Sequence, residues 1–206
     1  MNVRPLIFTA ALAFLAGAAQ AAPAALDTAA KAMSGMEASF THRFTAKGFK
    51  NAQSESGTVV FGELPRMRWS YSKPEQKLFV FDGTNSWFYV PGDKQVTQGR
   101  VTDARKRELP FLLIGDPAAR NRSFVVREQK RGGAIVTTLQ PRDKSATMKT
   151  VTVTIVPSTN LIQSIEYTDR DGNRTSFHFS GYHKRAASAD TFRFSAPPGV
   201  QVINAD

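Results

Sequence analysis

The stretch RMRWSYSKPEQKLFVFDGTNSWFYVPGDKQV, residues 66–96, decides the fold class. Short segments rich in aromatic and β-branched residues alternate here with turn residues, among them Asp82-Gly83 and Pro91-Gly92. This pattern is typical of consecutive antiparallel strands that are joined by tight turns. The stretch therefore predicts a β-meander.

The predicted strands of this stretch have one strongly apolar face. Successive side chains of a strand point to opposite faces, so residues two apart share a face. In the first strand, this rule separates an apolar pair from Arg66 and Arg68, which face the other way. We predict that one face of the sheet is lined by Met67, Trp69, Phe79, Phe81, Trp87 and Tyr89.

The same kind of pattern extends over most of the chain. Turn signals such as Gly132-Gly133 and Asp171-Gly172-Asn173 separate further segments with a period of two. Eleven or twelve strands with almost no crossover helices indicate an antiparallel barrel, half-barrel or sandwich. Besides the strands of residues 66–96, the predicted strands cover residues 39–46, 57–62, 95–100, 123–129, 133–141, 148–157, 161–169, 174–182 and 191–197.

Two segments depart from this pattern and predict helices. Residues 24–38 place Leu26, Met33 and Met36 on one stripe of an amphipathic helix. In RKRELPFLLIGD, residues 105–116, Pro110 is suited to the first helical position, and Gly115 is expected to end the helix. A shorter helix is predicted to begin after Thr102. We interpret these helices as a cover for the aromatic face, with apolar contacts from Phe111, Leu112, Leu113 and Ile114.

The N-terminus and the composition limit the class of protein. Arg4, an apolar run over residues 6–19 and the sequence Ala19-Gln20-Ala21 predict a signal peptide over residues 1–21. Residues 22–206 then form one exported domain, without cysteine and hence without disulfides. The formal net charge of the whole chain is +10. For an exported protein, this charge suits an anionic membrane surface or an acidic protein better than nucleic acid.

No catalytic or metal-binding pattern is present in the sequence. The three histidines, His42, His178 and His183, do not form a ligand or nucleophile motif, and phosphate-binding and hydrolase motifs are absent. We therefore predict a protein that is not an enzyme and that has no cofactor and no metal. Arg66 and Arg68 face away from Trp69, which disfavours a nucleic-acid surface that combines basic and aromatic residues.

Residues 66–96 resemble the core of the periplasmic outer-membrane lipoprotein carriers, the LolA family. The shared elements are a strand with Trp69, a proline, the Asp82-Gly83 turn, the W-x-Y strand over residues 87–89 and a turn that contains proline. LPFLLIG, residues 109–115, is similar to the apolar lid helix of the family, and TFRFSAPPGVQV, residues 191–202, is similar to its C-terminal motif.

The resemblance implies an incomplete antiparallel barrel of about eleven strands with a small helical lid over a hydrophobic cavity. Such a carrier shields the acyl chains of lipoproteins in the periplasm. It receives them from an inner-membrane ABC transporter complex and passes them to an outer-membrane receptor. A carrier that works alone would be a monomer.

The resemblance also assigns roles to the residues identified above. The aromatic face would line the lipid-binding cavity, and Leu26, Met33, Met36 and Phe111–Ile114 would form the lid. Ordinary core packing would produce the same apolar pattern. Arg66 and Arg68 would either dock an acidic partner or lie on a solvated strand face. Many family members have an arginine before the corresponding proline that bonds the closed lid, whereas Leu64 precedes Pro65 here.

Three alternatives remain open at this level. The same half-barrel could carry another lipid, such as a glycolipid or a pigment lipid, because a fold does not determine its ligand. It could also be a periplasmic sensor domain, although sensors of this type usually have a second domain. In a purely structural β-sandwich, the apolar segment would be only core.

Overall fold

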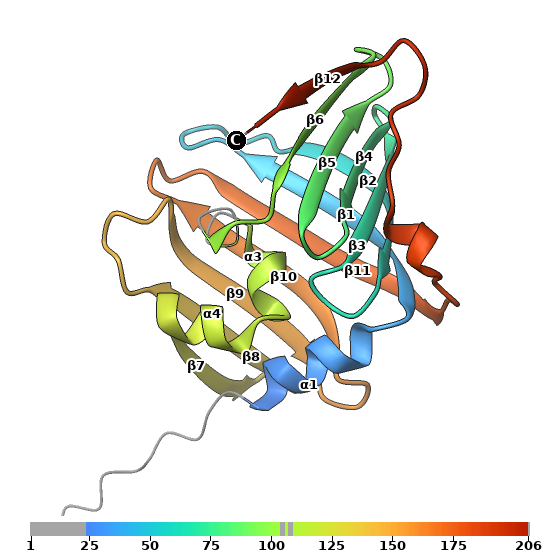
Figure 1. Cartoon of the computed structure of the whole chain (residues 1–206). Helices are drawn as coiled ribbons and strands as arrows, with labels where there is room; N and C mark the ends of the chain where they lie inside the picture. The colour runs from blue at the N-terminus through green and yellow to red at the C-terminus, as the bar shows by residue number, and fades with distance from the viewer. Residues whose placement is uncertain (1–23, 104–105, 107–108, 206) are drawn as a thin grey trace, which may run out of the picture.

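The protein is an open, curved β-sheet with helices on its concave side (Figure 1). The computed structural model describes residues 24–103, 106 and 109–205. The predicted signal peptide lies outside these residues, and the short helix predicted after Thr102 falls largely outside them. The predicted half-open antiparallel barrel is confirmed, with twelve strands in one sheet that does not close.

The order of the strands follows directly from a meander. The sheet runs β12-β6-β5-β4-β3-β2-β1-β11-β10-β9-β8-β7, so the first and second halves of the meander meet where β1 pairs with β11. All pairs are antiparallel except β12 with β6. The strands are β1 (Met36–Thr45), β2 (Gln53–Phe61), β3 (Met67–Lys73), β4 (Lys77–Phe81), β5 (Asn85–Val90), β6 (Gln95–Arg100), β7 (Phe124–Arg131), β8 (Ala134–Pro141), β9 (Met148–Val156), β10 (Leu161–Asp169), β11 (Arg174–Lys184) and β12 (Gln201–Asn204).

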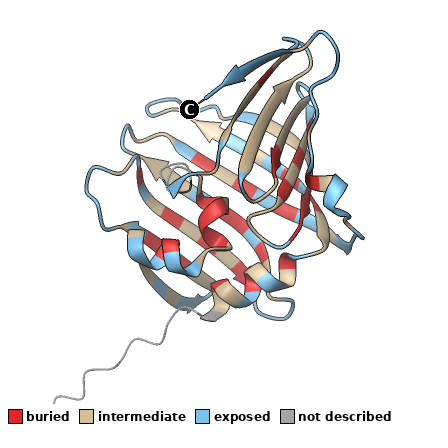
Figure 2. Cartoon of the chain, viewed as in Figure 1, coloured by how far each residue is buried: buried red, intermediate tan, exposed pale blue. Residues whose placement is uncertain are grey.

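In the described part of the chain, three helices lie on the concave side, and each of them carries buried residues (Figure 2). They are α1 (Ala24–Met33), α3 (Pro110–Ile114) and α4 (Pro117–Ser123). A short 3-10 helix, η1 (Ala189–Phe192), precedes the C-terminal segment. The helix predicted at Pro110 is therefore confirmed, and it begins at that proline.

The predicted extent of the first helix was wrong. The helix α1 ends at Met33, and Met36 is the first residue of β1 rather than a residue of the lid. Gly35 has a φ of +73°, a conformation that glycine adopts without strain and that commonly ends helices. Its N–H donates to the carbonyl of Phe61 at 2.9 Å, so the chain enters the sheet at this point.

The predicted C-terminal strand was also wrong. Residues 191–197 form the end of η1 and an irregular segment, and the last strand is β12. Two consecutive prolines, Pro197 and Pro198, have no N–H to donate to a ladder. The chain then turns at Gly199 and pairs in parallel with β6, where the N–H of Gln201 donates to the carbonyl of Lys94 at 2.8 Å.

The buried residues form two groups on opposite faces of the sheet. The main hydrophobic core lies between the concave face and the three helices and includes Trp69, Leu112 and Phe177. A smaller group lies on the convex face, where Val80 and Val96 are almost fully buried. The ribbon β3–β6 therefore carries buried apolar residues on both faces, Trp69 and Phe81 on the concave one and Val80 and Val96 on the convex one.

Candidate functional site

The concave face of β3–β5 carries a row of large apolar side chains. Residues directly opposite each other in an antiparallel pair share a face. Met67 pairs with Phe81, and Trp69 pairs with Phe79, so these four side chains lie together. Their predicted common face is confirmed.

The predicted position of Trp87 and Tyr89 was wrong. Trp87 pairs with Val80, and Tyr89 pairs with Leu78, which places both aromatic residues on the convex face. Phe88 takes the concave position instead, and its ring stacks on that of Phe79 with centroids 4.2 Å apart. Three consecutive aromatic residues make both faces of β5 apolar, so alternation alone could not identify the inner one.

The convex side chains of β5 have a cover of their own. The ring centroid of Phe194 lies 5.5 Å from that of Tyr89 and 6.4 Å from that of Trp87. Phe194 belongs to the irregular segment that follows η1. Trp87 and Tyr89 therefore pack under the C-terminal segment and not under the lid.

Strands from the second half of the meander complete the concave face. Phe177 and Phe179 of β11 lie 5.5 and 5.9 Å from the ring of Trp69, and Phe40 of β1 lies 5.0 Å from it. The sequence analysis did not assign these three residues to the site. Their alternation in SFTHRF and SFHFSGY was a usable signal, but the pairing of β1 with β11 was needed to bring them to Trp69.

Helix α3 covers this aromatic face. The ring of Phe111 meets Trp69 edge-on at 4.6 Å and Phe177 at 4.7 Å. Leu112, Leu113 and Ile114 are almost fully buried. The predicted contact between the apolar segment and the aromatic face is therefore confirmed, and Phe111 occupies the middle of that face in this conformation.

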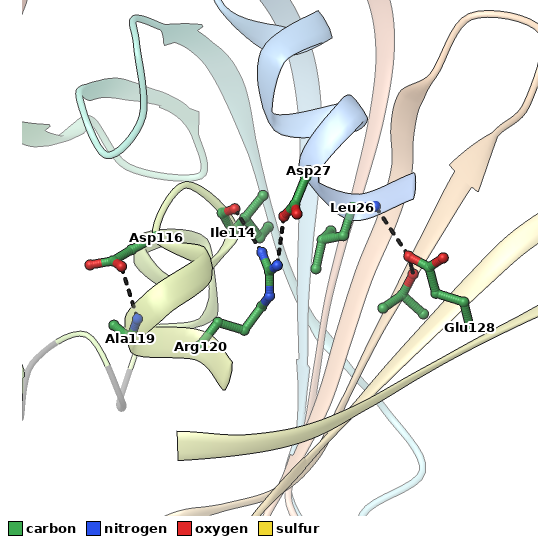
Figure 3. Close-up of polar contacts among 8 residues, drawn as sticks. Leu26, Asp27, Ile114, Asp116, Ala119, Arg120 and Glu128 are labelled. Atoms are coloured by element: carbon green, nitrogen blue, oxygen red, sulfur yellow. Dashed lines mark hydrogen bonds and ion pairs between the residues drawn. The ribbon is translucent and has the colours of Figure 1, made fainter. Parts of the chain in front are cut away.

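Helix α1 extends the cover along the sheet. Leu26 and Met33 of this helix are buried, and their role as lid residues stays a prediction. The N–H of Leu26 donates to Oε1 of Glu128 at 3.2 Å (Figure 3), which ties the start of α1 to β7. The same Glu128 oxygen lies 3.4 Å from the hydroxyl of Thr137.

One fully buried arginine joins the three helices (Figure 3). Arg120 of α4 donates from Nη2 to Oδ1 of Asp27 in α1 at 2.6 Å and from Nη1 to the carbonyl of Ile114 in α3 at 3.2 Å. Its Nε has no hydrogen-bond partner. A buried guanidinium needs such partners because desolvation of an unpaired charge is costly. The sequence analysis did not identify this residue, since its only local signal was one basic residue in a polar stretch.

The connection between α3 and α4 is fixed by Asp116. Its Oδ1 accepts from the N–H of Ala119 at 2.9 Å, as an N-cap does, and its Oδ2 accepts from Nζ of Lys106 at 2.8 Å. The hydrogen bond from Lys106 and that from the Ala119 N–H lower the pKa of the Asp116 carboxyl. The turn after the lid helix is therefore charged and capped at neutral pH.

The sequence of the chain matches a known family over most of its length. The family described as outer membrane lipoprotein carrier protein LolA matches residues 31–195. The protein belongs to the LolA family.

Curated relatives cover nearly the whole chain. The outer-membrane lipoprotein carrier protein of Xanthomonas oryzae pv. oryzae (strain MAFF 311018) is 30% identical over 194 residues, which are 92% of this chain and 91% of the relative. The protein of the same name from Methylibium petroleiphilum (strain ATCC BAA-1232 / LMG 22953 / PM1) is 32% identical over 203 residues, 96% of this chain and 97% of the relative.

A solved structure supports the fold at lower identity. An uncharacterized conserved protein from Thermus thermophilus superposes with a TM-score of 0.55 at 14% sequence identity. The match covers 90% of this chain and 99% of that chain. At this identity, the likeness concerns the fold alone.

Leu64, which precedes Pro65, packs beside the end of the lid helix α3. A Cβ added to Gly115, at the end of α3, would lie 2.2 Å from Cβ of Leu64. Only glycine therefore permits this close approach. The loop before β3 therefore contacts the lid through the apolar Leu64. The buried ionic contact among the helices is made by Arg120 with Asp27.

Arg66 and Arg68 lie on the side of the C-terminal segment. The guanidinium of Arg66 is 6.0 Å from the ring centroid of Phe192. Arg68 donates from Nη1 to the carbonyls of Thr191 and Arg193 at 3.3 and 3.4 Å, and burial lowers its pKa. These contacts give Arg68 a role in holding the segment, and docking of an acidic partner stays a prediction for both residues.

The concave face also carries a polar cluster that the sequence analysis did not identify. Nδ1 of His42 lies 3.1 Å from one oxygen of Glu55, and Nζ of Lys77 lies 2.5 Å from the other. Burial lowers the pKa of His42. For Glu55, burial raises the pKa, but the hydrogen bonds from Lys77 and His42 outweigh it and the net shift is downward. The apolar face is thus bounded by a charged pair that stays ionised at neutral pH.

Within residues 24–103, 106 and 109–205, no cluster of His, Cys, Asp and Glu is suited to hold a metal ion. In the same part of the chain, no helix is long and apolar enough to cross a membrane.

Proposed function

We propose that this protein is a periplasmic carrier that shields the acyl chains of lipoproteins released from the inner membrane. The observation that carries the proposal is the packing of Phe111 against Trp69 and Phe177 under a short helix. Acyl chains would displace this ring and take its place on the aromatic face. Each methylene moved out of water contributes about 0.8 kcal/mol, so two or three acyl chains need such a shelter.

The matches with named relatives favour lipoprotein as the cargo. Loading from an inner-membrane ABC transporter complex and delivery to an outer-membrane receptor are part of the proposal. The protein would act as a monomer, because one concave face and one lid suffice for one cargo molecule. A pocket lined by aromatic residues and methionine tolerates acyl chains of different shapes.

A release assay tests the proposal. Spheroplasts with labelled lipoprotein are incubated with the purified mature protein, and a soluble one-to-one complex is expected in the supernatant. Phe111→Asp is expected to abolish the complex, because a carboxylate would be placed on the aromatic face. Val202→Asp is the matched control, since it adds the same charge at an exposed site of β12.

The outcomes separate the alternatives. Release of lipoprotein that depends on Phe111 but not on Val202 supports the carrier. If folded wild-type protein releases no lipoprotein, the proposal is wrong. Mass spectrometry of lipids that copurify with the protein then decides whether the same face binds another lipid, such as a glycolipid.

A further inference from the structure

Three turns at one end of the strands lie next to one another (Figure 1). The turn between β1 and β2 is joined to the turn between β10 and β11 by the N–H of Lys47, which donates to Oδ1 of Asn173 at 3.0 Å. Arg170 of the turn between β10 and β11 donates to the third turn, which joins β8 to β9. Its Nε donates to the carbonyl of Ala146 at 2.8 Å, and its backbone N–H donates to that of Thr147 at 3.0 Å. The turns therefore form one continuous edge of the molecule.

This edge concentrates positive charge. The segments 43–50, 142–149 and 166–174 contain eight Lys and Arg residues against four Asp and Glu residues, a formal net charge of +4 on 25 residues. All eight of these cations are exposed. We call these three segments the basic rim. Its exposed cations include Lys47, Lys50, Lys144, Lys149, Arg170 and Arg174.

Two of the four carboxylates of the basic rim, those of Asp143 and Asp169, are used in its own turns. Oδ1 of Asp143 accepts from the N–H of Ser145 at 2.7 Å, and Oδ1 of Asp169 accepts from the N–H of Asn173 at 2.9 Å. These bonds fix the shape of the turns. The lysine side chains are left to extend into solvent.

The basic rim also presents the most exposed large apolar side chain of the described residues. Phe49 is 72% exposed and lies between Lys47 and Lys50 in the chain. Its N–H donates to the carbonyl of Ala46 at 3.0 Å, and the preceding Gly48 has a φ of +84°. A tight turn thus holds the phenylalanine out in water, where its exposure is unfavourable unless another surface covers it.

We propose that the basic rim docks on an anionic phospholipid surface, with Phe49 inserted between the headgroups. A protruding aromatic ring with lysines on both sides suits a deformable interface, because the ring enters the acyl boundary while the ammonium groups stay with the phosphates. Each lysine near such a surface strengthens binding about fivefold. The inference does not depend on the proposed function, since the rim and the lid helix belong to different elements.

Vesicle binding of the mature protein tests the inference. We expect sedimentation with vesicles of phosphatidylethanolamine and phosphatidylglycerol, no sedimentation with phosphatidylcholine vesicles, and loss of binding in about 0.5 M NaCl because salt screens the attraction. Phe49→Ser should lower the partition coefficient about tenfold. Lys47→Gln and Lys50→Gln should lower it about fivefold each. Val202→Ser, at another exposed apolar site, should leave it unchanged.

A label at the same position reports insertion directly. The chain has no cysteine, so Phe49→Cys and the control Val202→Cys can each carry one environment-sensitive fluorophore. Only the fluorophore at position 49 should show a blue shift of its emission maximum when phosphatidylglycerol vesicles are added. No binding to these vesicles, or equal effects of Phe49→Ser and Val202→Ser, would overturn the proposal. Loss through the lysine variants alone would also overturn it, because the rim would then adsorb by charge without insertion of Phe49.

Discussion

The two faces of the ribbon β3–β6 meet different segments of the chain, the concave one at β3 and the convex one along its length. On the concave face, the described contacts of α3 with the strands are made by apolar side chains such as Phe111. On the convex face, the C-terminal segment is hydrogen-bonded to the sheet, through Arg68 and through the pairing of β12 with β6.

This difference indicates which cover can be exchanged. Removal of a cover that is hydrogen-bonded to a strand would exchange several protein hydrogen bonds for bonds to water, and each such protein bond contributes about 0.5–1.5 kcal/mol. Removal of α3 from the aromatic face exchanges one apolar contact for another when acyl chains take its place. The carbonyl of Ile114 in α3 accepts a hydrogen bond from Arg120 of α4, which also pairs with Asp27 of α1. The lid helix is therefore positioned by the neighbouring helices rather than by the strands.

The largest expected effect tests whether the convex cover is part of the permanent fold. Phe192 is almost fully buried, so Phe192→Ala should lower the free energy of unfolding by about 3–5 kcal/mol. Phe111 is only partly buried, and Phe111→Ala should lower it by about 2 kcal/mol. Urea denaturation measures both. A larger loss at Phe111 would show that the comparison of the two faces is wrong.

The next effect concerns the ionic contact that positions the lid. Asp27→Ala removes the carboxylate partner of the buried Arg120 and should destabilise the protein by about 3 kcal/mol, the low end for a buried pair because Asp27 is partly in water. The exposed pair of Asp190 with Arg193 is the control, and Asp190→Ala should change stability by less than about 1 kcal/mol.

A double variant distinguishes pairing from packing at this site. If the loss in Asp27→Ala comes from the unpaired guanidinium, Asp27→Leu combined with Arg120→Met should recover most of the stability. A double variant that is as unstable as Asp27→Ala would mean that the helices pack poorly without a charged pair. Thermal and urea unfolding give the same comparison.

The smallest effect is a pH dependence at the polar end of the concave face. The pKa of His42 is lowered in the folded protein, so below about pH 6.5 the unfolded chain binds more protons. The contribution of His42 to the free energy of unfolding should therefore be fully present above about pH 6.5. It should decrease on acidification, by at most about 1.4 kcal/mol per pH unit. His42→Gln should flatten the profile between about pH 7 and pH 5, whereas His178→Gln, at an exposed position of β11, should not. Equal profiles for the two variants would exclude His42 as the source.

Local patterns predicted much of the fold and part of the candidate site. Period-two segments and turn residues identified most strands, and Pro110 and Gly115 bounded the lid helix. The face that contains Met67 and Trp69 followed from the same alternation. These features depend on residues that are neighbours in the chain, so no distant contact was needed to infer them.

Other features of the site depend on contacts between distant segments. Phe177 and Phe179 reach Trp69 only because β1 pairs with β11. Arg120 became identifiable only when α1 and α3 were seen to surround it. The polar cluster of His42, Glu55 and Lys77 likewise needs four strands in register, because β3 lies between β2 and β4.

The sequence by itself determined a meander of short strands, an aromatic face and a short apolar helix to cover it, since alternation and turn chemistry are local properties. Only the tertiary structure decided that Trp87 and Tyr89 face outward, that Met36 begins a strand and that the chain ends in β12. The physical reason is the same in each case. Strand register and long-range pairing choose between positions that local preferences leave equally favourable.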